Sequence, residues 1–138
     1  MIAVDTNILA RLYVDDPADP EARSQQVIAA ELFRTSDAIF VPVTVTLELE
    51  WVVRAFYDLP VADFDRLIAH LAALPNVVVE DREQVLEALA LARGGLGFAD
   101  ALHLTRSRHC ERFATFDDRG FARRASAAGA PIPVVVAR

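Results

Sequence analysis

The first twelve residues, reading MIAVDTNILARL, constrain the fold of this chain more than any other stretch. Ile2, Ala3 and Val4 suffice for a short buried strand, and an apolar helical pattern resumes directly after a polar turn. That turn begins with Asp5, so the predicted strand ends on a carboxylate. Open α/β sheets bind ligands beyond the carboxyl ends of their strands, where an acid is placed for chemistry. The alternative is that Asp5 only caps the helix that follows.

Strand and helix patterns alternate along the rest of the chain. The later predicted strands are residues 38–41, 77–79, 113–115 and 134–136, and the predicted helices are residues 20–34, 43–59, 61–75, 81–94 and 98–105, followed by a short helix after Gly120. Crossover connections between strands are right-handed, so we expect a mainly parallel sheet of about five strands with helices on both faces. The chain is therefore predicted to be α/β, with one domain over residues 1–138.

Composition narrows the class of protein. With 138 residues, of which 54% are hydrophobic, the chain can bury the core of one compact domain. It has neither a run of about 18 apolar residues nor a signal-peptide pattern, so we expect a cytoplasmic protein without membrane contact. The single cysteine, Cys110, cannot form an internal disulfide and is a poor metal ligand.

Net charge bears on nucleic-acid partners. A formal charge of −6 argues against a protein that coats nucleic acid through a broad basic surface. A nuclease stays possible, because bound divalent cations reverse the local charge of clustered acids. Arg119, Arg123 and Arg124 form a cluster that suits phosphate, and the alternative is a solvated helix face.

Three acids can join Asp5 at one place. Asp117 follows a predicted strand, as Asp5 does, and Asp100 lies in the first turn of a helix, where the helix dipole favours a carboxylate. Glu48 falls inside the apolar arc of helix 43–59, so we expect it to be buried and to point inward. Clustered carboxylates repel one another unless a cation binds, and oxygen-only ligands favour Mg²⁺ or Mn²⁺ over zinc. The chemistry that fits is hydrolysis of a phosphodiester by metal-activated water.

Two choices among neighbouring acids accompany this hypothesis. Glu48 is preferred to Glu50, because Glu50 can pair with Arg54 one turn later and point to solvent. Asp117 is preferred to Asp118, because Asp117 directly ends the strand and Asp118 is typical of a turn or cap residue.

Four motifs in order resemble the PIN domain, and most closely its bacterial VapC toxin branch. They are DTNIL after the first strand, T-x-E-L at 46–49, FADALHL at 98–104 and TFD at 115–117, and together they cover essentially the whole chain. The resemblance implies a sheet of order 3-2-1-4-5 and a Mg²⁺-dependent ribonuclease, the toxin of a type II toxin–antitoxin module. It also implies an RNA substrate, a VapB-like antitoxin and a homodimer. Its site residues would be the acids Asp5, Glu48, Asp100 and Asp117, with Thr6, Asn7 and Thr115 as polar support.

The sequence departs from the resemblance at one position and leaves two further points open. Many relatives carry an additional acid shortly before the position of Asp100, where this chain has Gly97. Trp51, Phe56 and Tyr57 are typical of core, but so many aromatic residues on one helix could also line a groove for a partner.

Competing functions differ in what they require. A response-regulator receiver needs a lysine, and the chain has none, while a phosphatase of the haloacid dehalogenase type needs an acid where Asn7 stands. A PIN-like domain that binds RNA with little or no catalysis remains an alternative. Metal-dependent cleavage would separate that binding module from the enzyme.

Overall fold

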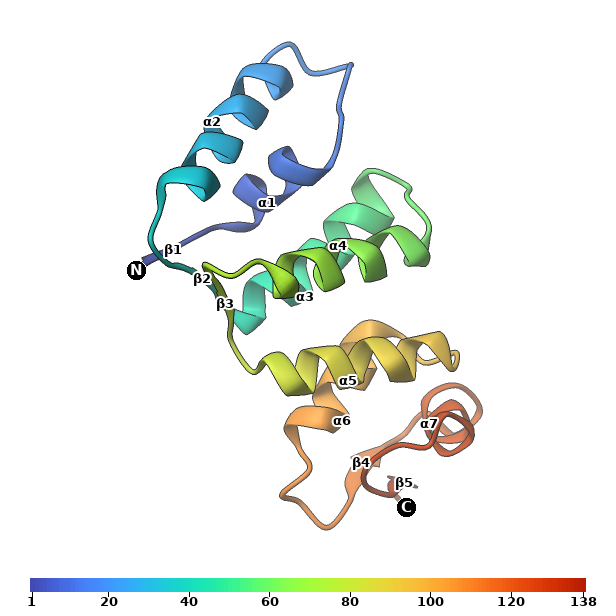
Figure 1. Cartoon of the computed structure of the whole chain (residues 1–138). Coiled ribbons are helices and arrows are strands. Elements are labelled where there is room, and N and C mark those ends of the chain that lie inside the picture. Colours follow the sequence, from blue (N-terminus) through green and yellow to red (C-terminus); the bar gives the residue numbers. More distant parts are fainter. The chain divides into compact units, whose positions relative to one another are not determined.

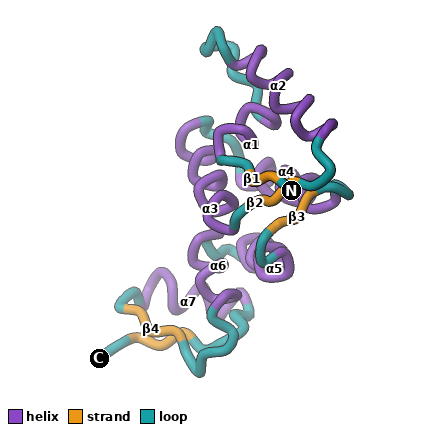
Figure 2. The backbone as a smooth tube through the Cα atoms, turned by 90° about the vertical axis from the view of Figure 1, so that its left-hand side faces the viewer, coloured by secondary structure: helices purple, strands orange, loops and turns teal.

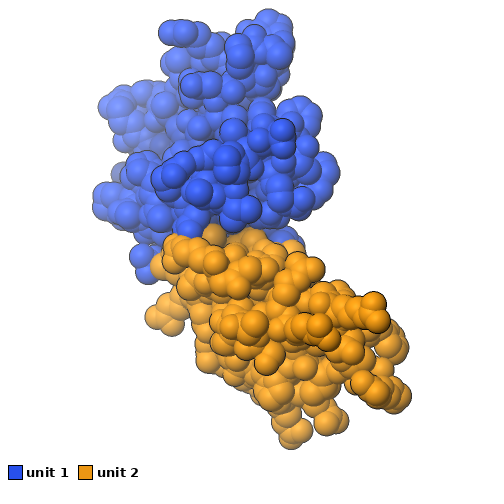
Figure 3. Space-filling model, turned by 90° about the vertical axis from the view of Figure 1, so that its right-hand side faces the viewer, with its two compact units in different colours: residues 1–82 blue, residues 83–138 orange.

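The computed structural model describes all residues from 1 to 138 and contains two compact units, Met1–Arg82 and Glu83–Arg138 (Figure 3). Helices dominate both units, and every strand has three residues or fewer (Figure 1). No helix in the structure combines the length and apolar character needed to cross a membrane. Each unit is described on its own.

The first unit is built on three parallel strands. Its elements are β1 (Ile2–Ala3), α1 (Thr6–Tyr13), α2 (Ala22–Thr35), β2 (Ile39–Val41), α3 (Val43–Trp51), a π-helical turn (Val52–Phe56), α4 (Val61–Ala73) and β3 (Val77–Val79). Strand β2 lies between β1 and β3, with Phe40 opposite both Ala3 and Val78 (Figure 2). Ile39 and Val41 of this central strand are completely buried, so the core of the unit lies against β2.

Helices α1 and α2 pack side by side, and the loop between them is held by Arg11 (Figure 1). The Arg11 guanidinium donates to Gln25 at 2.7 Å and pairs with Asp16 and Asp19. Asp19 also accepts a hydrogen bond from the amide of residue 21 at 2.9 Å. Helix α2 therefore begins at residue 22, two residues later than predicted, because the Asp19 carboxylate caps the preceding turn instead of the helix.

Helix α3 and its π-helical turn bury a narrower face than the sequence predicted. Its buried residues are Val43, Thr46 and Leu49, followed by Val53 in the π-helical turn, a spacing of three and four residues. Glu48 lies off this stripe and is exposed, so the prediction of an inward, buried Glu48 is wrong. The predicted arc was too wide, because it counted Trp51 and Phe56 as core, and these are 56% and 68% exposed.

The second unit carries a parallel pair of strands. Its elements are α5 (Arg82–Arg93), α6 (Phe98–Arg106), β4 (Phe113–Thr115), a π-helical turn (Asp118–Ala122), α7 (Arg123–Ala128) and β5 (Val134–Val136). Phe113 lies opposite Val134 in the ladder. The Thr105 hydroxyl donates to the Gln84 carbonyl at 3.0 Å and so ties α6 to α5. Helix α5 ends before Gly94 and Gly95, as predicted, and Gly95 has a φ of 103° that favours glycine.

The α/β class and the parallel pairing are confirmed, but the single five-stranded sheet of order 3-2-1-4-5 is not what the structure contains. A three-stranded sheet, β1-β2-β3, and a two-stranded sheet, β4-β5, take its place. The neighbours inside each part agree with the predicted order, since β2 pairs with both β1 and β3 and β4 pairs with β5. What differs is that no ladder joins the two parts into one sheet. With at most three residues each, these strands offer few ladder hydrogen bonds to define a further neighbour.

Candidate functional site

Asp5 lies between β1 and α1 with its side chain exposed. Val4 before it is buried, so the end of the strand is anchored while the next side chain faces solvent. The Asp5 Oδ1 accepts a hydrogen bond from the Thr6 amide at 2.7 Å, and the extended backbone at Asp5 is that of a helix cap. The capping role of Asp5 is therefore confirmed. It uses one of the two carboxylate oxygens.

A cleft of about 310 Å³ opens beside Asp5, between α1 and the helix formed by α3 and its π-helical turn. Asp5 and Glu48 are the two carboxylates that line it. Thr6, Asn7 and Arg11 are its other polar residues. The cleft thus brings together two of the four predicted acids, Asp5 and Glu48, and two of the three predicted supporting residues, Thr6 and Asn7. Glu48 lies more than forty positions after the other three in the sequence.

Arg11 supplies little free positive charge to this cleft. Its guanidinium is held by Gln25, Asp16 and Asp19. The hydrogen bond to the Asp19 carboxylate raises the pKa of Arg11, and the hydrogen bond from the amide of residue 21, followed by the contact with Arg11, lowers the pKa of Asp19. Both groups are therefore charged and neutralise each other, which leaves Asp5 and Glu48 to set the local charge.

The Thr6 hydroxyl is buried at the edge of this cleft without a hydrogen-bond partner. Thr6 is 4% exposed, and its Oγ1 lacks any protein donor or acceptor. A buried hydroxyl without a partner is unfavourable, and Thr6 is the residue of this cleft whose side-chain hydrogen bonding is incomplete. Asp5 and Glu48 are the carboxylates of the same cleft, and carboxylate oxygens are ligands that Mg²⁺ and Mn²⁺ favour.

Neither unit contains a complete cage of metal ligands. Within each unit, no three His, Cys, Asp or Glu side chains gather at one point. Mg²⁺ usually binds through one or two carboxylates and keeps several waters.

Asp117 repeats the arrangement of Asp5 in the second unit. It follows β4 after Phe116, is exposed, and accepts a hydrogen bond through Oδ1 from the Gly120 amide at 2.7 Å. Its own amide donates to the Thr115 hydroxyl at 3.1 Å. Asp117 is thus the capping residue, and of the two roles predicted for Asp118, turn or cap, the structure shows the turn. The Thr115 hydroxyl contacts the backbone of Asp117 directly.

Gly120 contacts the Asp117 carboxylate, and the sequence did not predict this contact. A Cβ on Gly120 would lie 2.5 Å from Oδ2 and 2.8 Å from Oδ1 of Asp117, closer than real Cβ atoms come to other atoms. The Asp117 carboxylate therefore lies directly over the Gly120 backbone. Its spacing from Asp117, three residues as in other capping turns, is the signal that could have identified it.

Asp100 lies where the sequence predicted, in the first turn of α6, and is half-buried. Gly97 precedes the helix with extended backbone. A Cβ on Gly97 would come within 3.8 Å of the Asp100 Oδ2, an ordinary contact distance. An acid at this position would have room beside Asp100, and this chain lacks it.

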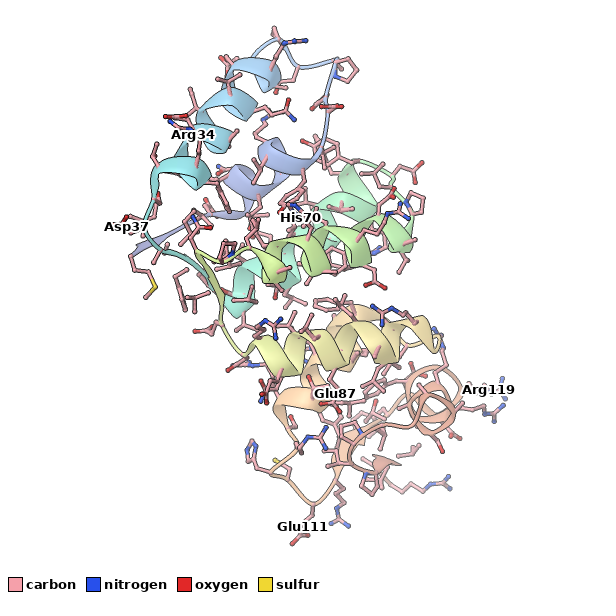
Figure 4. All side chains as sticks on the ribbon, viewed as in Figure 1. Arg34, Asp37, His70, Glu87, Glu111 and Arg119 are labelled. Atoms are coloured by element: carbon pink, nitrogen blue, oxygen red, sulfur yellow. The ribbon has the colours of Figure 1, made fainter.

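The predicted arginine cluster is exposed. Arg119 lies in the π-helical turn after Asp117 and projects from the ribbon in Figure 4, while Arg123 and Arg124 begin α7. In contrast, Arg108 is paired with Glu87. Three exposed guanidinium groups therefore follow Asp117 within seven residues.

The structure is that of an α/β protein with parallel strands, a class that binds its ligands beyond the carboxyl ends of the strands, where Asp5 and Asp117 are exposed. The chain belongs to one family of this class, the PIN domain family, whose sequence profile matches residues 2–127. PIN domains have the fold of metal-dependent nucleases and generally use divalent metal ions. No protein among those with curated descriptions matches the chain.

Proposed function

We propose that this PIN domain is a Mg²⁺-dependent endoribonuclease and the toxin of a type II toxin–antitoxin module of the VapC kind. One observation carries the proposal: Asp5 and Asp117 each lie two residues after a parallel strand, and each carboxylate is fixed through one oxygen by a backbone amide and is otherwise exposed. Open α/β sheets bind ligands beyond such strand ends. The motif resemblance at 5–9, 46–49, 98–104 and 115–117 supports the toxin branch.

The proposed metal ligands are Asp5, Glu48, Asp100 and Asp117. A bound Mg²⁺ or Mn²⁺ would supply Lewis-acid chemistry and activate water toward the phosphodiester. The amides of Thr6 and Gly120 orient the carboxylates of Asp5 and Asp117 through hydrogen bonding. The Thr115 hydroxyl fixes the backbone at Asp117, and Thr6 and Asn7 offer hydroxyl and amide groups beside Asp5.

RNA can bind an acidic protein only at a surface where the local charge is positive. With a net charge of −6, the protein repels RNA as a whole, so contact concentrates where exposed arginines are unopposed. Arg119, Arg123 and Arg124 supply this surface next to Asp117. Their guanidinium forks match phosphate oxygens.

The proposed toxin function implies partner proteins. We propose a VapB-like antitoxin, a homodimer and a cytoplasmic location, as the resemblance to the VapC branch implies. An antitoxin arginine that enters among the proposed ligands would form bidentate carboxylate pairs and displace the cation. Antitoxin binding should therefore suppress both Mn²⁺ binding and RNA cleavage.

The decisive experiment compares three variants that keep side-chain shape and remove one negative charge. Asp5→Asn and Glu48→Gln should lower Mg²⁺-dependent cleavage of RNA by about a hundredfold or more, as loss of an electrostatic contribution of a few kcal/mol does. Asn caps helices as well as Asp, so Asp5→Asn should fold normally. Cleavage rates and thermal unfolding measured on the same preparations test both statements.

Glu50→Gln is the matched control for Glu48→Gln. Glu50 accepts a hydrogen bond from Arg54 at 2.7 Å, so the predicted ion pair is present. The Glu50 side chain is 14% exposed and therefore points less to solvent than predicted. Loss of this pair should change stability by about 0.5 kcal/mol or less and leave cleavage unchanged. Equal loss of cleavage in Glu48→Gln and Glu50→Gln would reject Glu48 as a ligand. Metal-independent RNA binding without any cleavage by the unaltered protein would favour the binding module instead.

A further inference from the structure

The cleft beside Asp5 has an aromatic wall that the proposed hydrolysis does not use. Trp51, Phe56 and Tyr57 line the same cavity of about 310 Å³ as Asp5 and Glu48. Trp51 is 56% exposed and Phe56 is 68% exposed, while Leu49 before them and Val53 between them in sequence are buried. Two large aromatic side chains thus face water next to two carboxylates.

The π-helical turn explains why these rings share one cleft. In a regular α-helix a step of five residues rotates a side chain by about 140°, which would place Trp51 and Phe56 on different faces. Here the Tyr57 amide donates to the Val52 carbonyl at 3.1 Å, five residues back, and the turn is widened. The widened turn brings Phe56 back toward the face of Trp51. Such insertions in helices are frequent at functional sites.

The orientation of Phe56 is also fixed locally. Its ring meets that of Tyr57 edge to face, with centroids 4.9 Å apart and planes at 84°. The Phe56 ring is therefore held against Tyr57 while it stays exposed to the cleft.

The chemistry around the wall indicates what it binds. Exposed aromatic faces offer stacking surfaces to any planar ring, and the adjacent carboxylates are those that we propose to hold a cation for phosphate. The Asn7 side chain lines the same cleft and can both donate to and accept from the edge of a base. A planar ring linked to a phosphate matches all three features, whereas the apolar face of a protein helix would leave the carboxylates and Asn7 unpaired.

We propose that Trp51 and Phe56 form a stacking site for an unpaired nucleobase of the RNA that lies next to the bond to be cleaved. A base in a duplex is stacked and paired, so it cannot enter such a site without being extruded. The RNA substrate is therefore single-stranded at this position, in a loop, a bulge or an end. This inference rests on the proposed function, because that function brings the RNA backbone to Asp5 and Glu48.

The test uses Trp51 itself, which is the only tryptophan in the chain. The full chain with Asp5→Asn, in which we expect cleavage to be slow, is titrated with a short single-stranded RNA rich in adenine and with an abasic oligonucleotide of the same length. Stacking predicts that the RNA quenches Trp51 fluorescence and that the abasic strand, which carries the same phosphates, does not. Equal quenching by both strands would overturn the proposal, because phosphate contact alone would then explain the signal.

Aromatic and aliphatic replacements of Phe56 separate stacking from simple apolar contact. Phe56→Leu should weaken binding of labelled single-stranded RNA by about tenfold or more, as loss of one stacked base does, and Phe56→Tyr should retain it. Trp51→Leu should likewise weaken RNA binding, and Trp51→Phe should retain it. Equal affinities of the leucine and aromatic variants would overturn the proposal. So would Trp51 emission that changes with protein concentration but not with RNA, since the wall would then be an interface between protein copies.

The two measurements distinguish failure of the stacking site from failure of the ribonuclease assignment. RNA-specific quenching in a protein that never cleaves RNA with metal would contradict the enzyme and retain the stacking site. Metal-dependent cleavage that is unaffected by Phe56→Leu, together with absence of quenching, would overturn the stacking site and retain the enzyme.

Discussion

At the scale of the residue, a helix cap and a metal ligand are compatible roles for one carboxylate. Asp5 and Asp117 each accept one backbone hydrogen bond through Oδ1, at 2.7 Å in both cases, and each stays exposed. The backbone bond removes rotational freedom from the carboxylate before any ligand arrives, so less entropy is lost on binding. The two interpretations of Asp5 that the sequence left open are therefore both consistent with its geometry.

Gly120 provides a test of this orientation without any change to an acid. Gly120→Ala places a Cβ within 2.5 Å of Asp117 Oδ2, so the carboxylate must turn away and lose its hydrogen bond to the amide of residue 120. The φ of Gly120 is not positive, so alanine itself fits the backbone. If Asp117 is a ligand, Mg²⁺-dependent cleavage should fall by about tenfold or more, because catalysis is sensitive to misplacements of about 1 Å. Cleavage rates and Mn²⁺ affinity measure the effect.

Gly97→Ala is the matched control for this variant. Its Cβ would lie 3.8 Å from the Asp100 Oδ2, so the carboxylate there need not move. Gly97→Ala should unfold at a temperature close to that of the unaltered protein, and Gly120→Ala should lose no more than the contribution of one helix cap, about 1 kcal/mol. Unchanged cleavage in Gly120→Ala would show that the position of the Asp117 carboxylate does not matter for activity.

At the scale of the element, α1 is linked to α4 by one aromatic pair. The Tyr13 hydroxyl and the His70 Nδ1 are 2.7 Å apart, and the two rings meet edge to face at 5.5 Å. Both residues line a cavity of about 580 Å³ together with apolar residues of α4 and of the π-helical turn. This partial burial raises the pKa of Tyr13 to about 12, because the phenolate is poorly solvated there.

This raised pKa predicts a loss of stability in alkaline solution. Between the ordinary tyrosine pKa of about 10 and the folded value of about 12, the unfolded chain loses the Tyr13 proton first, so the folded state binds more protons. The free energy of unfolding should therefore fall as pH rises from about 10 to about 12, with no such contribution below pH 10. Tyr13→Phe should remove this part of the pH dependence, and urea unfolding at several pH values measures it.

Tyr57→Phe is the control, because Tyr57 is the only other tyrosine in the chain. It should keep the alkaline loss that Tyr13→Phe removes. At neutral pH, Tyr13→Phe should cost at most about 1 kcal/mol, the usual contribution of one exposed hydrogen bond. An identical alkaline slope in both variants would show that Tyr13 is not responsible.

At the scale of the whole molecule, charge is the property that most limits function. The chain carries 20 acidic and 14 basic residues, and all the basic ones are arginine. Several arginines are paired within helices or loops, as Arg34 is with Glu31 and Arg66 with Asp63. The exposed cluster of Arg119, Arg123 and Arg124 is thus a local exception in an acidic molecule.

Replacement of this cluster should weaken RNA binding in a salt-dependent way. Each phosphate contact of a single strand contributes about 0.7 to the slope of log affinity against log salt, so Arg123→Ala with Arg124→Ala should lower that slope by about 1.4. Mn²⁺ affinity should not fall, because neither residue is a ligand. Arg23→Ala with Arg34→Ala on α2 removes the same charge and should leave the slope unchanged, as fluorescence anisotropy at low and moderate salt would show. Equal slopes for both double variants would assign Arg123 and Arg124 to a solvated helix face.

Local patterns determined the elements and the identity of the candidate acids. The apolar stretches at 77–79 and 113–115 and the paired glycines after Arg93 placed strands and helix ends within a residue or two of those observed. Such features depend on near neighbours along the chain, so sequence carries them directly. The motifs around Asp5, Glu48, Asp100 and Asp117 indicated the PIN domain family in the same way.

Only the tertiary structure decided how these elements face one another. It showed that Glu48 is exposed in a cleft with Asp5, because Val43, Thr46 and Leu49 form the buried stripe of α3. A hydrophobic arc is broad, and the contacts of a helix with its neighbours select which part of it is buried. The pairing of the strands and the exposed aromatic wall of Trp51 and Phe56 likewise depend on residues far apart in sequence. Residues far apart in sequence contribute interaction energy only once they are in contact in the folded chain, so no local sequence pattern encodes these contacts.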